Sequence, residues 1–201
     1  MGRLRSCLGV RYRPVVYPQS LREESRKAIL QAAAELIRDH GFDGASVGVV
    51  MKAVGLTHGG FYAHFMDKAD MLTAAMAQAL VPTVDRFDRW TTDAAAAGDP
   101  ARVAQAYLSD HHVAHPGQGC AVAALVSEVR RQGMPLRAVF ATEAEASAVI
   151  LGRLFPGDVP WGVLAIMSGA LTLMRAVPDE AMRAEIRARV MLDLHKLALP
   201  D

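Results

Sequence analysis

Ser46–Lys68 reads SVGVVMKAVGLTHGGFYAHFMDK, and the expected fold of the chain is built outward from this stretch. Four apolar residues recur at i, i+3, i+4 and i+7, the spacing of one helix face: Val47, Val50, Met51 and Val54. Ser46 stands where an N-cap belongs. Gly55 follows the last apolar residue, where a left-handed backbone favours glycine. The pattern predicts a short helix that ends in a tight turn.

A second short helix is predicted after this turn. Thr57 is placed to cap its start. Phe61 and Phe65 are four residues apart and point inward together, so Tyr62 and His64 lie on other faces and can meet a partner. Two helices joined by a glycine turn form the helix-turn-helix layout, whose second helix enters the major groove of DNA.

The rest of the chain is predicted to be all-α, with about nine helices, because no stretch alternates with period two. Residues 1–19 carry four arginines and no acids, which indicates a flexible basic arm or an unstructured leader. Residues 20–66 are predicted to form a three-helix helix-turn-helix domain. A fourth helix should begin after Asp67 and run to about Trp90, kinked or split at Pro82. One further helix is expected from Asp99 to about His115.

Charge and cysteine content narrow the class of protein. Residues 1–68 hold ten Lys and Arg against six Asp and Glu, whereas residues 69–201 hold twelve against fifteen. The basic excess lies on the helix-turn-helix segment and suits a polyanion there. Cys7 and Cys120 form no disulfide framework, so a reducing cytoplasm is expected. No apolar run is long enough to span a membrane.

The segment LTHGGFYAHFMDK at 56–68, followed by Asp70-Met71-Leu72, resembles the signature of the TetR family of transcriptional regulators. The resemblance implies that residues 67–201 form a ligand-binding and dimerisation domain. It implies a homodimer that binds a double-stranded, palindromic DNA operator, usually as a repressor released by a small-molecule effector. We predict no enzymatic activity, cofactor, catalytic site or metal site.

The resemblance also implies which residues contact DNA. Residues at positions that commonly touch phosphates are Ser46, Tyr62, His64 and Lys68. Residues where the family contacts bases or flanking phosphates are Thr57, His58 and Gly59. Gly60 departs from the family's frequent Thr or Ala, which lowers helix propensity by roughly 1 kcal/mol. His58 is therefore the main side-chain reader of this turn, and the glycines allow a close backbone approach.

The resemblance places seven residues on helices that would enclose an effector pocket: Tyr107, His111, Cys120, Met134, Phe140, Trp161 and Met167. Plain core packing is the alternative for the aromatic and methionine side chains. His111 and His115 have the i, i+4 spacing of a metal-ligand pair, although helix caps fit equally. Cys120, at a helix start, is either an electrophile sensor with a lowered pKa or an inert buried thiol.

Two alternative functions remain open from the sequence, and the last helices predict an assembly. The protein could bind DNA without an effector, in which case its second domain has a filled core. A Cys/His enzyme built on Cys120 would need an orienting partner, and no local motif supplies one. Trp161–Ala176 is apolar nearly all round, as buried helices are. The last two helices are expected to dimerise through four apolar residues: Met182, Ile186, Val190 and Leu194.

Overall fold

The computed structural model describes residues 19–155 and 161–198, and every regular element within them is helical. This confirms the all-α prediction and the number of about nine helices. The elements are α1 (Gln19–Gly44), α2 (Val47–Ala53), the 3-10 helix η1 (His58–Ala63), α3 (Lys68–Ala96), α4 (Ala101–Tyr107), α5 (Asp110–Ala114), the 3-10 helix η2 (Pro116–Gln118), α6 (Ala121–Val129), α7 (Met134–Leu151), α8 (Trp161–Ala176) and α9 (Glu180–Ala198). The predicted basic arm lies outside the described residues, apart from Gln19.

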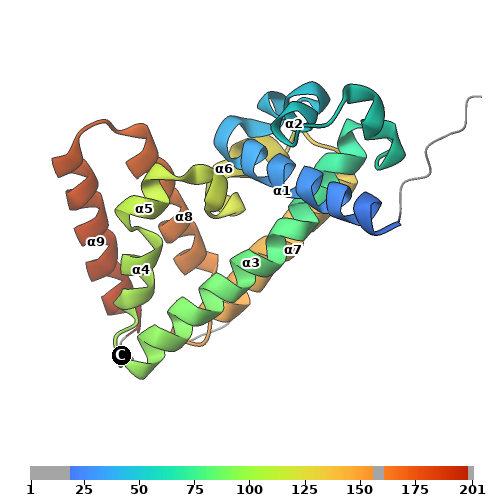
Figure 1. The fold of residues 1–201 in the computed structure, drawn as a ribbon. Helices are drawn as coiled ribbons and strands as arrows, with labels where there is room; N and C mark the ends of the chain where they lie inside the picture. Colours follow the sequence, from blue (N-terminus) through green and yellow to red (C-terminus); the bar gives the residue numbers. More distant parts are fainter. Residues whose placement is uncertain (1–18, 156–160, 199–201) are drawn as a thin grey trace, which may run out of the picture.

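Two long helices, α3 and α7, run side by side in the same direction (Figure 1). The first three helical elements gather at one end of this pair, and α8 and α9 lie toward the other (Figure 1). Asp67 caps α3 by accepting a hydrogen bond from the backbone N–H of Asp70 at 2.8 Å. Of the kink or split predicted at Pro82, the split is wrong, because α3 is one helix from Lys68 to Ala96 with Pro82 inside it. Pro82 is exposed, so its ring does not disturb the packing of α3 on α7.

The first hydrophobic core is formed mainly by α1, α2, η1 and the beginning of α3, and it extends to α6 and α7. Ala121, Leu125 and Val129 of α6 and Leu136 of α7 are buried in the same cluster. Glu128 of α6 also accepts a hydrogen bond from the backbone N–H of Phe42, at 3.2 Å. A displacement of α6 therefore disturbs the helices that carry the helix-turn-helix.

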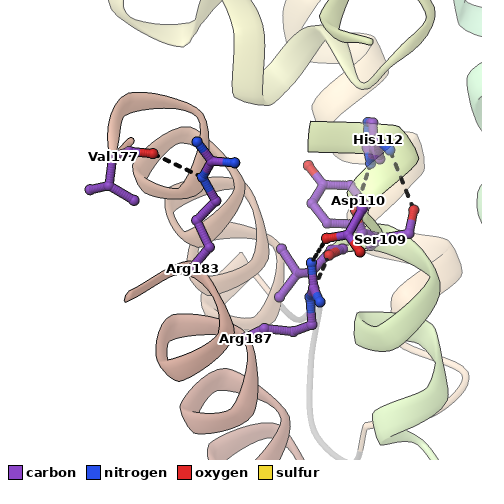
Figure 2. Close-up of polar contacts among 8 residues, drawn as sticks. Ser109, Asp110, His112, Val177, Arg183 and Arg187 are labelled. Carbon is purple, nitrogen blue, oxygen red and sulfur yellow. Dashed lines mark hydrogen bonds and ion pairs between the residues drawn. The ribbon is translucent and has the colours of Figure 1, made fainter. Parts of the chain in front are cut away.

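The second core is centred on Tyr107 and joins α3, α4, α6, α7, α8 and α9. The single helix predicted for 99–115 is two helices, because the side chain of Ser109 interrupts it and caps α5. Ser109 Oγ accepts a hydrogen bond from the backbone N–H of His112 at 3.4 Å (Figure 2). No helix in the described part of the chain is long and apolar enough to cross a membrane.

One of the four residues predicted for the dimer contact is covered within the protomer. Leu194 is fully buried in the second core, whereas Ile186 and Val190 pack against that core and stay partly exposed. The expectation that α8 is buried all round is also wrong. The exposed large apolar side chains of this helix pair include Ile166, Leu173, Met182 and Leu192. A second copy of the chain could cover this face.

Candidate nucleic-acid interface

The first helix and turn of the 46–68 stretch form as predicted. Ser46 Oγ accepts a hydrogen bond from the backbone N–H of Val49 at 3.3 Å and caps α2. Gly55 has φ of 70°, the left-handed conformation that the position required. The backbone N–H of Leu56 donates to Met51 O at 2.9 Å and closes the turn. The direction of the chain into the next element is thus fixed by local bonds.

The second element is a 3-10 helix, η1, where an α-helix was predicted. Gly59 and Gly60 weaken α-helix formation, and a short 3-10 turn is the usual outcome of a weak helical segment. Thr57 occupies the N-cap position, but its side chain makes no capping hydrogen bond, so that part of the prediction is wrong. Phe61 and Phe65 are buried, with ring centroids 5.5 Å apart, as expected.

The outer face of η1 carries the side chains that were assigned to DNA. Tyr62 is 67% exposed and stands edge-on to Phe61, with ring centroids 5.3 Å apart. His58 is exposed, and its ring centroid lies 6.3 Å from that of Tyr62. Because Phe61 and Phe65 anchor the inner face, His58 and Tyr62 are held at a defined place on the surface.

Two arginines of α1 support this face, and the sequence analysis did not single them out. Arg22 donates a hydrogen bond to the backbone oxygen of Ala63, at the end of η1. The guanidinium of Arg26 lies 4.6 Å from the ring centroid of Phe65. Burial lowers the pKa of His64, and the charges of Arg22 and Arg26 add to this. The i, i+4 spacing of the two arginines was the available signal.

Lys68 has a partner within the protein. Its Nζ donates a hydrogen bond to the backbone oxygen of Phe42 at 2.7 Å, which joins the start of α3 to the end of α1. An ammonium group has three N–H donors, so others stay available. Substitution of Lys68 would nevertheless change the support of the domain as well as any phosphate contact.

The seven residues assigned to a pocket do not surround one cavity. Tyr107, Cys120 and Met167 are buried in the second core, and Phe140 is half-buried. The remaining three, His111, Met134 and Trp161, are exposed. Met134, at 68% exposure, is the first residue of α7 and faces solvent. Within one protomer the exposure of Met134 and Trp161 gives no support to their assignment to an effector pocket.

Cys120 does not have the properties predicted for a reactive thiol. It is buried, and burial raises its pKa, with the carboxyl of Glu143 adding to the effect. The start of a helix stabilises a thiolate and so lowers the thiol pKa, whereas burial destabilises the thiolate and raises the pKa. At Cys120 burial has the larger effect. The structure therefore favours the alternative that Cys120 is an inert buried thiol.

His112 is committed to the structure through both ring nitrogens. Its Nδ1–H donates to Tyr107 O at 2.6 Å, and its Nε2 accepts from the backbone N–H of Cys120 at 2.9 Å. No nitrogen is left to act as a base toward Cys120, so the geometry gives the enzyme alternative no support. Within 19–155 and 161–198, no three His, Cys, Asp or Glu side chains converge as a metal site would require.

Glu143 is a buried carboxyl that the sequence analysis missed. It is fully buried on α7, and neither oxygen has a hydrogen-bond partner within the described residues. Burial raises its pKa to about 7, against the opposing effect of Arg38. Glu143 recurs on the apolar face of α7 with Leu136 and Ser147, and a charged residue at such a position was the available signal.

Replacing Glu143 by Gln should stabilise the protein more at pH 8 than at pH 5. The folded-state pKa lies above the unfolded value of 4.5, so stability is lost as pH rises from about 4.5 through about 7. Over this window the loss amounts to roughly 3 kcal/mol. Thermal unfolding at both pH values measures it. The matched control is Glu145→Gln, on the exposed side of the same helix; an equal gain at both pH values for Glu143→Gln contradicts the account.

Residues 29–75 match the family described as bacterial regulatory proteins, tetR family. This part of the chain resembles the TetR family. The matched residues run from Ile29 in the first core to Ala75 in α3 and contain the whole of α2, the glycine turn and η1. A relative, the HTH-type transcriptional regulator AcrR of Shigella flexneri, is 39% identical over 51 residues. This match covers 25% of the chain and 24% of the relative.

Solved structures share the fold over most of the chain. The reduced form of E. coli NemR has a TM-score of 0.71 and 17% identity, covering 89% of this chain and 98% of NemR. A TetR-family transcriptional regulator from Cytophaga hutchinsonii has a TM-score of 0.69 and 18% identity, covering 92% and 100%. At such identities the likeness concerns the fold alone, and the helices beyond Ala75 need their own functional argument.

Proposed function

We propose that this protein is a sequence-specific DNA-binding transcriptional regulator of the TetR family. It binds a palindromic operator as a homodimer, represses transcription there, and is released by a small-molecule effector. The observation that carries the proposal is the outer face of η1, where His58 and Tyr62 are exposed above the buried pair Phe61 and Phe65.

Two glycines of η1 support this assignment. A methyl group at Gly59 would have no neighbour within 4 Å, and at Gly60 it would lie 3.7 Å from Thr57 Oγ1, an ordinary contact. Neither residue has a positive φ. Nothing within the protomer therefore requires glycine at these positions, whereas a close approach of the backbone to a DNA groove does. Thr57 and Ser46 lie on the same stretch and can donate to phosphates.

The exposed apolar face of α8 and α9 supports a dimer. Ile166 and Leu173 are seven residues apart on α8, two helical turns along one face, and Met182 and Leu192 are exposed on α9. Side chains of this size are exposed together at sites of association. Two recognition elements in one dimer read half-sites about one DNA turn apart, roughly 34–36 Å.

Effector release requires a connection between the second core and α1, and η2 supplies it. The peptide of Gly117 lies between two side chains of α1: Arg38 Nε donates to Gly117 O and Asp39 Oδ1 accepts from Gly117 N, each at 2.6 Å. The continuous helix α3 already joins the helix-turn-helix to the second core. With η2 there is a second route by which a change beside α5 reaches the DNA-binding helices.

His58→Ala should flatten base preference at one or two positions in each half-site. An imidazole that donates to a purine acceptor contributes roughly 1–3 kcal/mol of discrimination, whereas phosphate contacts supply the sequence-independent affinity. Selection of bound oligonucleotides from a random pool measures the preference. Tyr62→Phe is the control, since loss of a phosphate contact should weaken all sequences about equally. Unchanged preferences in His58→Ala would show that η1 is not the reader.

A further inference from the structure

A cavity of about 400 Å³ lies on the side of α3, bounded by α5 and η2. From α3 it is lined by Arg86, Arg89, Trp90 and Asp93. Its other wall includes His111 and His115. Because these residues come from α3, from α5 and from the segment that joins α5 to η2, the cavity lies beside the second core and does not use the exposed dimer face.

The charge of the lining favours an anion. Two guanidinium groups face one carboxylate, that of Asp93, and neither Arg86 nor Arg89 forms an ion pair within the described residues. Burial lowers the pKa of Arg86, and the nearby charge of Arg89 adds to this, so the pair is incompletely compensated. A carboxylate between two arginines would remove that repulsion and accept charge-assisted hydrogen bonds.

The two histidines form the polar wall opposite the arginines. The rings of His111 and His115 are stacked with centroids 4.2 Å apart. His115 Nδ1–H donates to the backbone oxygen of His111 at 2.8 Å, which fixes the ring and makes Nε2 an acceptor in this tautomer. The hydrogen-bond donors for an anion are therefore the two guanidinium groups.

Trp90 gives the cavity an aromatic wall. Its ring packs edge-on against Phe87 and Tyr107, with centroids 5.8 and 6.2 Å away, and this cluster fixes its orientation. The guanidinium of Arg86 lies 6.0 Å from the Trp90 centroid. A flat apolar body can therefore lie on Trp90 while its acid group reaches the arginines.

We propose that this cavity binds a small aromatic carboxylate, held by Arg86 and Arg89 with its ring against Trp90, and that this molecule class contains the effector. Only the second part of this proposal, that the bound molecule class contains the effector, rests on the proposed function. Binding in the cavity is a property of the protomer and can be measured without DNA.

The position of the cavity explains how a bound molecule would affect α1. Arg86 Nη1 donates to the backbone oxygen of Gln118 at 2.6 Å, at the end of η2. A carboxylate that binds Arg86 competes with this bond. The neighbouring residue, Gly117, is the one that Arg38 and Asp39 of α1 hold.

The opposite side of α5 is fixed, so movement passes to η2. Arg187 of α9 donates to Leu108 O at 2.8 Å and pairs with the carboxylate of Asp110 (Figure 2). Arg183 in the same helix donates to Val177 O at 2.8 Å, which steadies the start of α9 (Figure 2). With α5 attached to α9, a shift of Gln118 is passed to Gly117 and from there to Arg38 and Asp39 of α1.

The test uses Trp161→Phe, which leaves Trp90 as the single tryptophan of the full chain. Emission of Trp90 is followed during titration with benzoate at constant ionic strength. Benzamide is the uncharged match, and inorganic phosphate is the compact anion. We expect a saturable change with benzoate, with both other probes binding at least about tenfold more weakly. Equal binding of benzamide overturns the anion assignment, and equal binding of phosphate overturns the aromatic one.

A matched pair of variants assigns the site. Arg89→Gln should weaken benzoate binding about tenfold, whereas Arg130→Gln, an exposed arginine after α6, should leave it unchanged. No saturable change in the parent, or equal affinity in Arg89→Gln, overturns the site. Benzoate should also lower DNA affinity in the parent. If it binds at the cavity and DNA affinity is unaltered, the effector assignment fails, and if the protein binds no DNA at all, the proposed function fails separately.

Discussion

Leu173→Glu should convert the protein into a monomer and reduce its affinity for a palindromic operator by at least about 100-fold. Leu173 is 57% exposed on the free face of α8. In a dimer of the proposed kind this side chain is covered by the partner, and a buried, unpaired carboxylate opposes association strongly. Each protomer then binds its half-site alone and loses the effective concentration that a linked pair provides, a factor of roughly 10²–10⁴.

Val149→Glu is the matched control for this change. Val149 is 53% exposed on α7, so the same charge enters a similarly exposed apolar position away from the α8 and α9 face. Light scattering at micromolar concentration and operator titration report assembly and binding separately. A Leu173→Glu protein that stays dimeric would show that the dimer uses another surface.

His112→Ala should lower the free energy of unfolding by about 3–5 kcal/mol. The change removes both ring hydrogen bonds and leaves the carbonyl of Tyr107 and the N–H of Cys120 buried without partners. It also removes edge-on packing against Tyr107, whose ring centroid is 4.8 Å away. Urea unfolding followed by circular dichroism measures the loss. His111→Ala, the exposed neighbour, should change stability by less than about 0.5 kcal/mol.

The same variant has a pH signature. Burial lowers the pKa of His112 to about 4, against an unfolded value of 6.5. Stability from the neutral ring is complete above pH 6.5 and is lost as pH falls toward 4, because the unfolded chain then binds the proton. Glu143 has the opposite slope between 4.5 and about 7. His112→Ala should therefore make the protein less sensitive to acid, and an unchanged pH profile would contradict the neutral, doubly bonded ring.

Features set by local chemistry were predictable from the sequence. Ser46 and Gly55 act within a few residues of themselves, and both behave as expected. Phe61 and Phe65 were correctly placed because their spacing alone puts them on one face. The 3-10 form of η1 was not predicted, although the low helix propensity of Gly60 was noted and favours it.

Features set by tertiary packing were not predictable in the same way. Periodicity identifies an apolar side chain, but it does not say which neighbour covers it, so Leu194 was assigned to a partner when its own core holds it. Met134 and Trp161 were assigned to a pocket by resemblance and are exposed. Lys68 was assigned to phosphate, and its bond to Phe42 O depends on where α1 ends relative to α3.

The most direct test of the account is selection of bound fragments from the genome of origin by the full-length protein. We predict enrichment of an inverted repeat whose half-site centres lie about 10–10.5 base pairs apart, or a multiple of that spacing, bound by two protomers. Mass photometry or analytical ultracentrifugation of the complex counts the protomers. Fragments that share no repeat, or a complex that contains one protomer on a single site, would contradict the proposal that a dimer reads a palindromic operator through η1.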